Sequence, residues 1–213
     1  MKKKLIKFLP LLILLIFNSC LGLSTDIQMR RNGSGRISME YRVPGITESI
    51  GRLDGNERWP ILANGRADWE RTVQRLDGIE LVSFSSRERA NEITTRVTLD
   101  FDSMNDLAAL LDANGTKMSF SQSGFSILIV DPVSADLNPD LLELTRQVSS
   151  GYKFTMSFSG EGNSTLAFVD GTLREIPPPR GCEIVSSGRK VSFSIDTYEL
   201  LSLTGGFGIR INY

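Results

Sequence analysis

Cys20 is the residue of this sequence whose type and position point most directly to chemistry. It follows a start with four lysines and an almost wholly apolar run from Phe8 to Phe17. A basic head, a short apolar core and small or polar residues at the exit are typical of a secretory signal peptide. The apolar run is ten residues long, whereas a membrane-spanning helix needs roughly 18 or more. The sequence therefore predicts export with cleavage close to Cys20.

The residues around the cleavage point favour a lipoprotein signal. Such signals usually end in Leu, a small residue, Gly or Ala, and then Cys, and the same positions here read Phe17, Asn18, Ser19 and Cys20. This resembles the relaxed motif that spirochaetes and some other bacteria tolerate, and it departs from the strict pattern at Phe17 and Asn18. We expect residues 1–19 to be removed and Cys20 to carry palmitate and related acyl chains. Several acyl chains would anchor the protein firmly, since one chain alone binds a membrane only marginally. The alternative is a soluble exported protein that is cut nearby.

Other residues that could do chemistry are few. The chain has no histidine, which removes Ser-His-Asp and Cys-His catalysis and the commonest metal ligand. Asp100 and Asp102 share a strand face and could form a carboxylate pair, Cys182 could be a reactive thiol, and residues 54–56 and 112–115 faintly resemble calcium loops. Solvated charges, an unactivated thiol and turns are the simpler interpretations. We expect no catalytic residue, no cofactor and no metal.

Composition indicates a folded domain with no affinity for nucleic acid. Roughly 190 residues follow the leader, enough for one large domain or two small ones. They contain 20 basic and 25 acidic residues, a net charge of −5, and no basic stripe, so nucleic acid is excluded as a partner. If Cys20 carries lipid, Cys182 has no partner for an intramolecular disulfide. Stability must then come from a packed core.

Strict alternation of apolar and polar residues is the dominant pattern. It runs through residues 37–43, 93–101, 152–158 and 191–195. Alternation belongs to strands with one face on a core and the other in water, and such sheets are usually antiparallel. Turn residues such as those at 32–35 fall where hairpins need them. The sequence predicts an α+β fold: one antiparallel sheet of repeated β-hairpins with three or four short helices on its apolar face.

Helical patterns separate the hairpins. They cover residues 68–76, 103–114, 138–151 and, as a short fourth helix, 198–203. Ser103 with Asp106 forms a variant of the capping box, and Asn138 with Pro139 is a second helix start. The two caps lie 35 residues apart, which suggests a structural repeat.

The chain divides into a leader, a tether and one domain. Residues 20–25 are expected to be a lipidated tether and residues 26–213 a single domain. Within it, residues 49–65 read as a long loop whose Trp59 is either a contact residue or part of the core edge. Residues 176–181 contain three prolines and read as a stiff connector rather than a recognition motif.

Two stretches near the C-terminus carry a resemblance. Tyr152 to Glu161 is a strand that ends near a glycine, and Gly188 to Ile195 matches a "G-x-x-V-x-W" strand followed by a short Leu-rich helix. Together with the hairpin of residues 26–41, they resemble the LppM-type domain of bacterial envelope lipoproteins. Phe193 stands where that family usually has tryptophan, and no C-terminal transmembrane helix is evident. The resemblance implies a lipid-anchored α+β domain that binds lipids or glycolipids and has no catalytic activity.

Three hypotheses about function follow from these patterns. The first is a non-enzymatic lipoprotein, anchored at the periplasmic or surface side of a membrane, that binds a lipid or other amphipathic ligand in an apolar groove between sheet and helices. The second is a scaffold or assembly lipoprotein that binds another envelope protein through a sheet edge or the 49–65 loop. The third, an enzyme, is the weakest. A pocket of several hundred cubic ångströms favours the first, whereas a filled core with exposed apolar residues favours the second.

Overall fold

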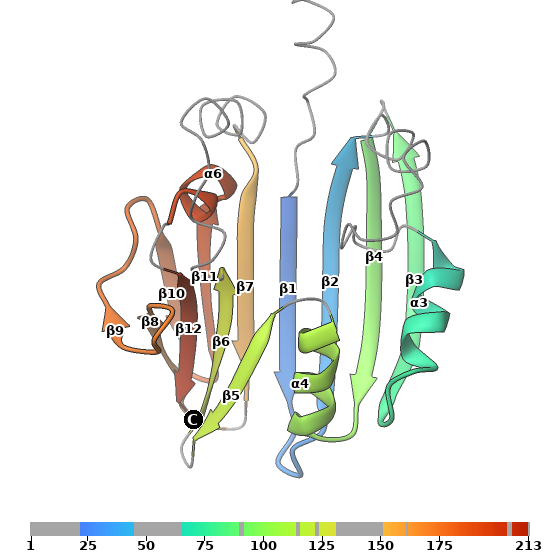
Figure 1. Ribbon diagram of the computed structural model, residues 1–213, viewed down its shortest axis with the longest axis horizontal. Helices are drawn as coiled ribbons and strands as arrows, with labels where there is room; N and C mark the ends of the chain where they lie inside the picture. The colour runs from blue at the N-terminus through green and yellow to red at the C-terminus, as the bar shows by residue number, and fades with distance from the viewer. Residues whose placement is uncertain are drawn as a thin grey trace, which may run out of the picture.

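The computed structural model describes residues 22–44, 65–89, 92–113, 116–121, 124–130, 151–160, 162–203 and 206–212. Within these ranges the chain forms strands and short helices (Figure 1). The strands are β1 (Gly22–Met29), β2 (Gly35–Pro44), β3 (Ile79–Arg89), β4 (Glu92–Phe101), β5 (Lys117–Ser121), β6 (Gly124–Val130), β7 (Lys153–Ser159), β8 (Thr165–Val169), β9 (Glu175–Ile176), β10 (Glu183–Ser187), β11 (Lys190–Asp196) and β12 (Phe207–Asn212). The helices are α3 (Arg66–Val73), α4 (Met104–Ala113) and α6 (Thr197–Leu201).

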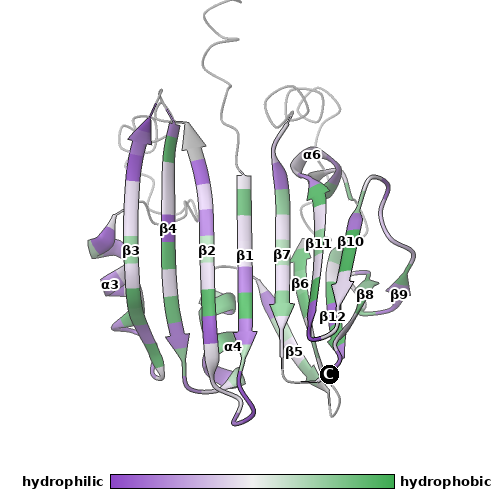
Figure 2. Ribbon diagram, turned by 180° about the vertical axis from the view of Figure 1, so that it is seen from behind, coloured by the Kyte–Doolittle hydropathy of each residue, from purple (hydrophilic) through white to green (hydrophobic). Residues whose placement is uncertain are grey.

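The larger sheet has seven strands in the order β10-β11-β7-β1-β2-β4-β3. Strand β1 lies in the middle, antiparallel to β2 and parallel to β7. Hydrophilic and hydrophobic residues alternate along these strands (Figure 2), as the sequence pattern predicts. One face of the sheet is therefore apolar and the other polar, because successive side chains point to opposite faces.

The smaller sheet has five strands in the order β5-β6-β12-β8-β9 and packs on the apolar face of the larger sheet. Phenylalanines from both sheets meet in the interior. The Phe125 and Phe158 ring centroids are 5.2 Å apart, and those of Phe168 and Phe193 are 5.5 Å apart. Phe207 of β12 stacks on Phe168 at 5.5 Å. Edge-to-face and offset pairs at these distances are favourable beyond their burial, so this layer fixes the two sheets against each other.

The helices complete the cover of the apolar face. Helix α4 begins where predicted: the Ser103 hydroxyl donates to the Asp106 carboxylate at 2.6 Å and accepts from the Asp106 amide at 3.3 Å. It buries Leu107, Leu110 and Leu111. Helices α3 and α6 occupy residues 66–73 and 197–201, close to the predicted 68–76 and 198–203. The predicted helix 138–151 lies, apart from Gly151, outside the described residues.

Two features of the predicted sheet differ from the structure. The described strands form two sheets rather than one, and much of the apolar face is covered by strands instead of helices. A run of repeated hairpins is not confirmed: β1–β2, β3–β4, β5–β6 and β10–β11 are hairpins, but β7 and β8 lie in different sheets. The reason is that alternation reports which residues are buried and does not report which strands are neighbours.

The predicted tether and loops have mixed outcomes. Strand β1 begins at Gly22, so residues 22–25, expected to be a tether, lie in the sheet. The 49–65 loop lies, apart from Gly65, outside the described residues. The 176–181 connector leads from β9, at an edge of the smaller sheet, to β10, at an edge of the larger one. No helix in the described part of the chain is long and apolar enough to cross a membrane.

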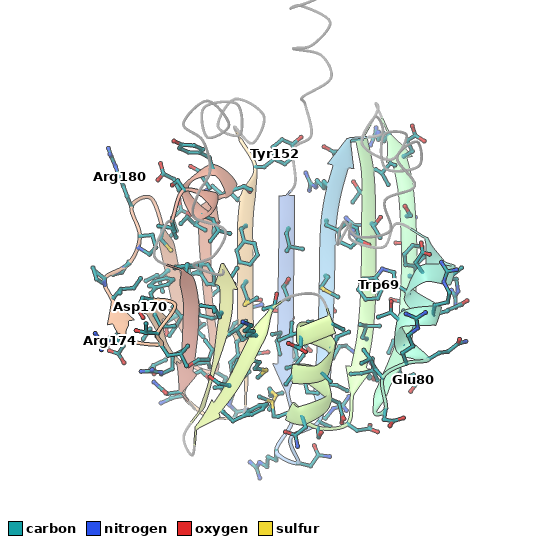
Figure 3. All side chains as sticks on the ribbon, in the orientation of Figure 1. Trp69, Glu80, Tyr152, Asp170, Arg174 and Arg180 are labelled. Carbon is teal, nitrogen blue, oxygen red and sulfur yellow. The ribbon has the colours of Figure 1, made fainter. Side chains whose placement is uncertain are left out.

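Trp69 shows how α3 is held on the sheet. Its side chain is buried beneath the helix (Figure 3), and its indole N–H donates to the Tyr41 hydroxyl at 3.2 Å. Burial raises the pKa of Tyr41 although hydrogen bonds to Trp69 and Thr95 oppose the shift. The phenol therefore stays neutral, and its hydroxyl holds the Trp69 indole of α3 against β2, the strand that carries Tyr41.

We expect Tyr41→Phe to lower the free energy of unfolding by about 1–2 kcal/mol, because it removes the acceptor of a buried donor. Tyr152→Phe is the matched control: its hydroxyl donates to Glu92 at 3.1 Å in a half-buried site, where water replaces the lost bond, so its effect should be at most half as large. Urea denaturation measures both. Equal losses in the two variants would contradict the structural role of Tyr41.

Candidate functional site

Asp100 and Asp102, the two residues that could form a carboxylate pair, have different surroundings. Asp100 lies on the polar face of β4 and accepts two hydrogen bonds from the Arg36 guanidinium, at 2.6 and 2.9 Å. The hydrogen bond from Arg36 holds the pKa of Asp100 below its ordinary value. Asp102 lies beyond the strand end and is exposed. A general acid needs a raised pKa, so the ion pair leaves Asp100 with a structural role.

The Cys182 thiol is half-buried at the start of β10. Burial raises its pKa, and the neighbouring Glu183 carboxylate raises it further. The thiolate is the reactive form, and both effects disfavour it.

Several predicted residues lie outside the described part of the chain. These are the lipidation site Cys20, the loop residues 54–56 and Trp59. Of residues 112–115, Asp112 and Ala113 end α4 and the next two are not described. In the part of the chain that the structure describes, no group of three or more Cys, Asp and Glu residues is arranged to hold a metal ion.

A polar cluster that sequence reasoning missed is centred on Asp26 of β1. Its carboxylate accepts hydrogen bonds from the Ser157 hydroxyl of β7, from the Gln28 amide at 2.7 Å and from the Lys190 ammonium of β11 at 3.0 Å. Parallel pairing places Asp26 opposite Ser157, and β11 pairs with β7 on its other side. Alternation puts all these residues on the polar face, but nothing in the sequence indicates that β1 and β7 are neighbours.

The Asp26 cluster stabilises the centre of the sheet. Burial alone would raise the pKa of Asp26, but the hydrogen bonds from Ser157, Gln28 and Lys190 outweigh it and hold the pKa below the ordinary value of 3.8. A second group, Glu40 with Arg96 at 2.6 Å and Arg42 at 3.2 Å, lies on the neighbouring strands. Within each cluster the carboxylate pairs with basic side chains of the same fold. These interactions on the polar face therefore have a structural role.

The hollows with described linings are open and mostly polar. One of about 440 Å³ lies at the start of β1, with Arg42, Glu40 and Lys153 in its wall. Another of about 400 Å³ lies on the outer face of the smaller sheet, next to Arg210. A hollow with a mainly apolar lining, beside Met104, measures about 200 Å³. Sites for drug-sized ligands are mainly apolar and occupy roughly 300–1,000 Å³, so none of these three hollows has both the size and the lining for an amphipathic ligand.

Strand β10 forms an exposed edge of the seven-stranded sheet (Figure 2). All five of its residues are exposed, and the exposed fractions of Ile184 and Val185 are 44% and 61%. Two of the four exposed large hydrophobic side chains among the described residues therefore lie on this strand; the others are Val82 and Phe120. An edge strand presents unpaired backbone donors and acceptors that can pair with another chain.

The other described edges carry protective features. Strand β3 has a register shift between Leu81 and Ser83, ends in alternating charges at residues 87–89 and contacts α3. Strand β5 starts with Lys117 and contacts α4, and β9 has only two residues, with three prolines following. Bulges, lysine, short strands and covering helices are the usual means of blocking an edge. Strand β10 has no proline, lysine or register shift in its pairing with β11, so it is the least protected edge of the described fold.

Comparison with known proteins gives a weak likeness of fold. No protein-family model matches the chain, and no curated protein matches it. Among solved structures, the NMR structure of the folded domain of LppM from Mycobacterium tuberculosis is similar over 91% of this chain and 90% of that chain, with a TM-score of 0.44 and 9% identity. At this level the likeness carries no inference about ligands or residues.

We expect Asp26→Asn to lower the free energy of unfolding at neutral pH by about 1–3 kcal/mol, the usual contribution of hydrogen bonds to a charged group. Because the folded pKa of Asp26 lies below its ordinary value, its contribution is complete above about pH 4 and is lost as pH falls through the folded pKa. The deficit of the variant should therefore shrink on acidification. Chemical denaturation at pH 7 and at low pH measures it.

Asp196→Asn is the control for this measurement. Asp196 lies at the exposed end of β11 on the same sheet, and its side chain makes no capping bond to α6. Its substitution should change the free energy of unfolding by less than about 0.5 kcal/mol at either pH. A deficit of Asp26→Asn that stays constant with pH would show that the ionised carboxylate is not what stabilises the cluster.

Proposed function

We propose that this protein is a lipid-anchored, non-enzymatic scaffold of a bacterial cell envelope that binds another envelope protein through strand β10. The observation that carries the proposal is the contrast between the filled interior and the open edge. Apolar side chains of both sheets and α4 fill the described core, whereas β10 exposes both its backbone edge and two apolar side chains. A surface of this kind suits the addition of a strand from another chain.

The anchor is inferred from the leader and from the position of β1. A basic head, a ten-residue apolar run and Cys20 favour acylation. Strand β1 starts two residues after Cys20 and lies in the middle of the larger sheet. A lipid on Cys20 would therefore hold the folded domain directly at the membrane surface, where β10 is accessible to neighbouring proteins.

The amphipathic-ligand hypothesis is weaker within the described part of the chain. It needs an apolar groove between sheet and helices, and there the space is occupied by residues such as Phe125, Phe193 and Leu107, each at most 1% exposed. Enzymatic function is the weakest hypothesis. Carboxylates with lowered pKa values at Asp26 and Asp100, and a Cys182 thiol with a raised pKa, lack the activation that catalysis needs.

Anchoring predicts a specific behaviour of Cys20→Ser. The wild-type chain should incorporate labelled palmitate and partition into the detergent phase, because acyl chains supply about 0.8 kcal/mol per buried CH₂. The variant should incorporate no label and remain in the aqueous phase after export. Cys182→Ser is the control, and it should label and partition like the wild type. A Cys20→Ser chain that still partitioned into detergent, or a wild-type chain without label, would refute the anchor.

Binding through β10 predicts position-specific crosslinking in intact cells. A photoreactive amino acid placed at Val185 should give a discrete adduct with an envelope protein, identified by mass spectrometry. The same group at Val82 is the matched control, because Val82 is 44% exposed but lies on the protected edge β3. No adduct at Val185, or equal adducts at both positions, would contradict the proposed binding edge.

A further inference from the structure

The hairpin between β10 and β11 determines which backbone groups of β10 face outward. Its loop has two residues, Gly188 and Arg189, and Gly188 has φ +58°. In such a hairpin the closing pair, Ser187 with Lys190, exchanges hydrogen bonds, and the pattern then alternates along the strand. The backbone groups of residues 183, 185 and 187 therefore point to β11. Those of Ile184 and Ser186 point away from the sheet.

We infer that the protein bound at this edge is a second copy of the same chain, with its β10 antiparallel to the first and Val185 opposite Val185. This register places Ile184 opposite Ser186 of the second copy, and Ser186 opposite its Ile184. Because these are the residues with outward-facing groups, four backbone hydrogen bonds form across the junction. The two seven-stranded sheets become one continuous sheet, and the interface is the same patch on both copies, as two-fold symmetry requires.

The exposed side chains fit this register. The backbone N–H and C=O of Val185 bond to β11 of the same chain. The two opposed Val185 residues are therefore a non-hydrogen-bonded pair, the kind in which side chains come closest. Val185 is 61% exposed in the single chain, and contact with its copy removes this apolar surface from water. Apolar pairs directly opposite each other are a main source of stability between strands.

Charges at the ends of the strand are also complementary. In the same register, Arg189 of each copy lies alongside the start of the other copy's β10, where Glu183 is located. Glu183 already accepts a hydrogen bond from Lys153 of its own chain at 3.3 Å. Opposite charges on neighbouring positions of paired strands attract, whereas like charges repel. The two Glu183 residues lie at opposite ends of the junction and do not oppose each other.

The symmetry is compatible with two lipid anchors in one membrane. A two-fold axis between antiparallel strands is perpendicular to the sheet, so the starts of the two β1 strands lie at the same level relative to the sheet plane. Both lipids on Cys20 can then enter the same membrane when the continuous sheet lies along its surface. Confinement to that surface raises the effective concentration of the chain, which favours association through a junction of four backbone bonds.

This inference rests on the proposed function, because it names the partner of the same edge, and disulfide crosslinking tests it. The acylated full-length chain with Cys182→Ser serves as background, and Val185→Cys or Ser187→Cys is added to it. Opposed Val185 positions have Cα atoms about 4.5 Å apart, within the range for a disulfide, whereas the two Ser187 positions are about 14 Å apart. Mild oxidation of intact cells should convert Val185→Cys to a species of doubled mass, at least about tenfold more than Ser187→Cys.

A second pair of variants checks the register. Glu183→Cys with Ser187→Cys in one chain should also crosslink, because these positions oppose each other, and the Cys182→Ser background alone should stay monomeric. A monomeric Val185→Cys, or equal crosslinking at Val185 and Ser187, overturns the inference. If the photoreactive group at Val185 then still captures a different envelope protein, only the identity of the partner is wrong. If it captures nothing, the proposed binding edge fails as well.

Discussion

The parallel pairing of β1 with β7 is the interaction on which the larger sheet depends. Without it, the described strands would form two separate groups, β2-β4-β3 with β1 on one side and β7-β11-β10 on the other. Six consecutive residue pairs, from Leu23–Phe154 to Gln28–Ser159, connect the two groups. Parallel pairing needs a long crossover and is slightly less stable per residue than antiparallel pairing. The Asp26–Ser157 hydrogen bond and the Lys190 contact add polar bonds across this junction.

The same junction brings strand β1, the first described strand, to the centre of the fold. Strand β1 is paired on both sides, so a force or an anchor at its start is transmitted to seven strands rather than to an edge that could unravel. The tether expected over residues 22–25 is instead part of β1. The predicted lipid and the folded domain are thus separated by very few residues. If Cys20 carries the predicted lipid, the fold then sets the orientation of the domain at the membrane.

The sequence allows a good prediction of which residues are buried and a poor prediction of which strands pair. Alternation at 37–43, 93–101, 152–158 and 191–195 correctly indicates strands with an apolar face, and Ser103 correctly indicates the start of α4. The second sheet was missed because β6, β12 and β8 come from distant segments and their pairing leaves no periodic signal. The Asp26 cluster was missed for the same reason. The interpretation of Cys182 as an unactivated thiol rests, at the level of sequence, on the absence of a neighbouring base.

The two faces of the larger sheet and its edges have different roles. The apolar face is committed to the phenylalanine layer and to α4, and on the polar face the Asp26, Glu40 and Asp100 carboxylates bind their own neighbours. A surface whose polar groups are already bonded gains little from a partner, because each new hydrogen bond replaces an existing one. Backbone groups at an unprotected edge are hydrogen-bonded to water, so a bound strand displaces water rather than a protein partner. Strand β10 combines such groups with the exposed Ile184 and Val185, so pairing with a second strand there would bury apolar surface and break few existing contacts of the described fold.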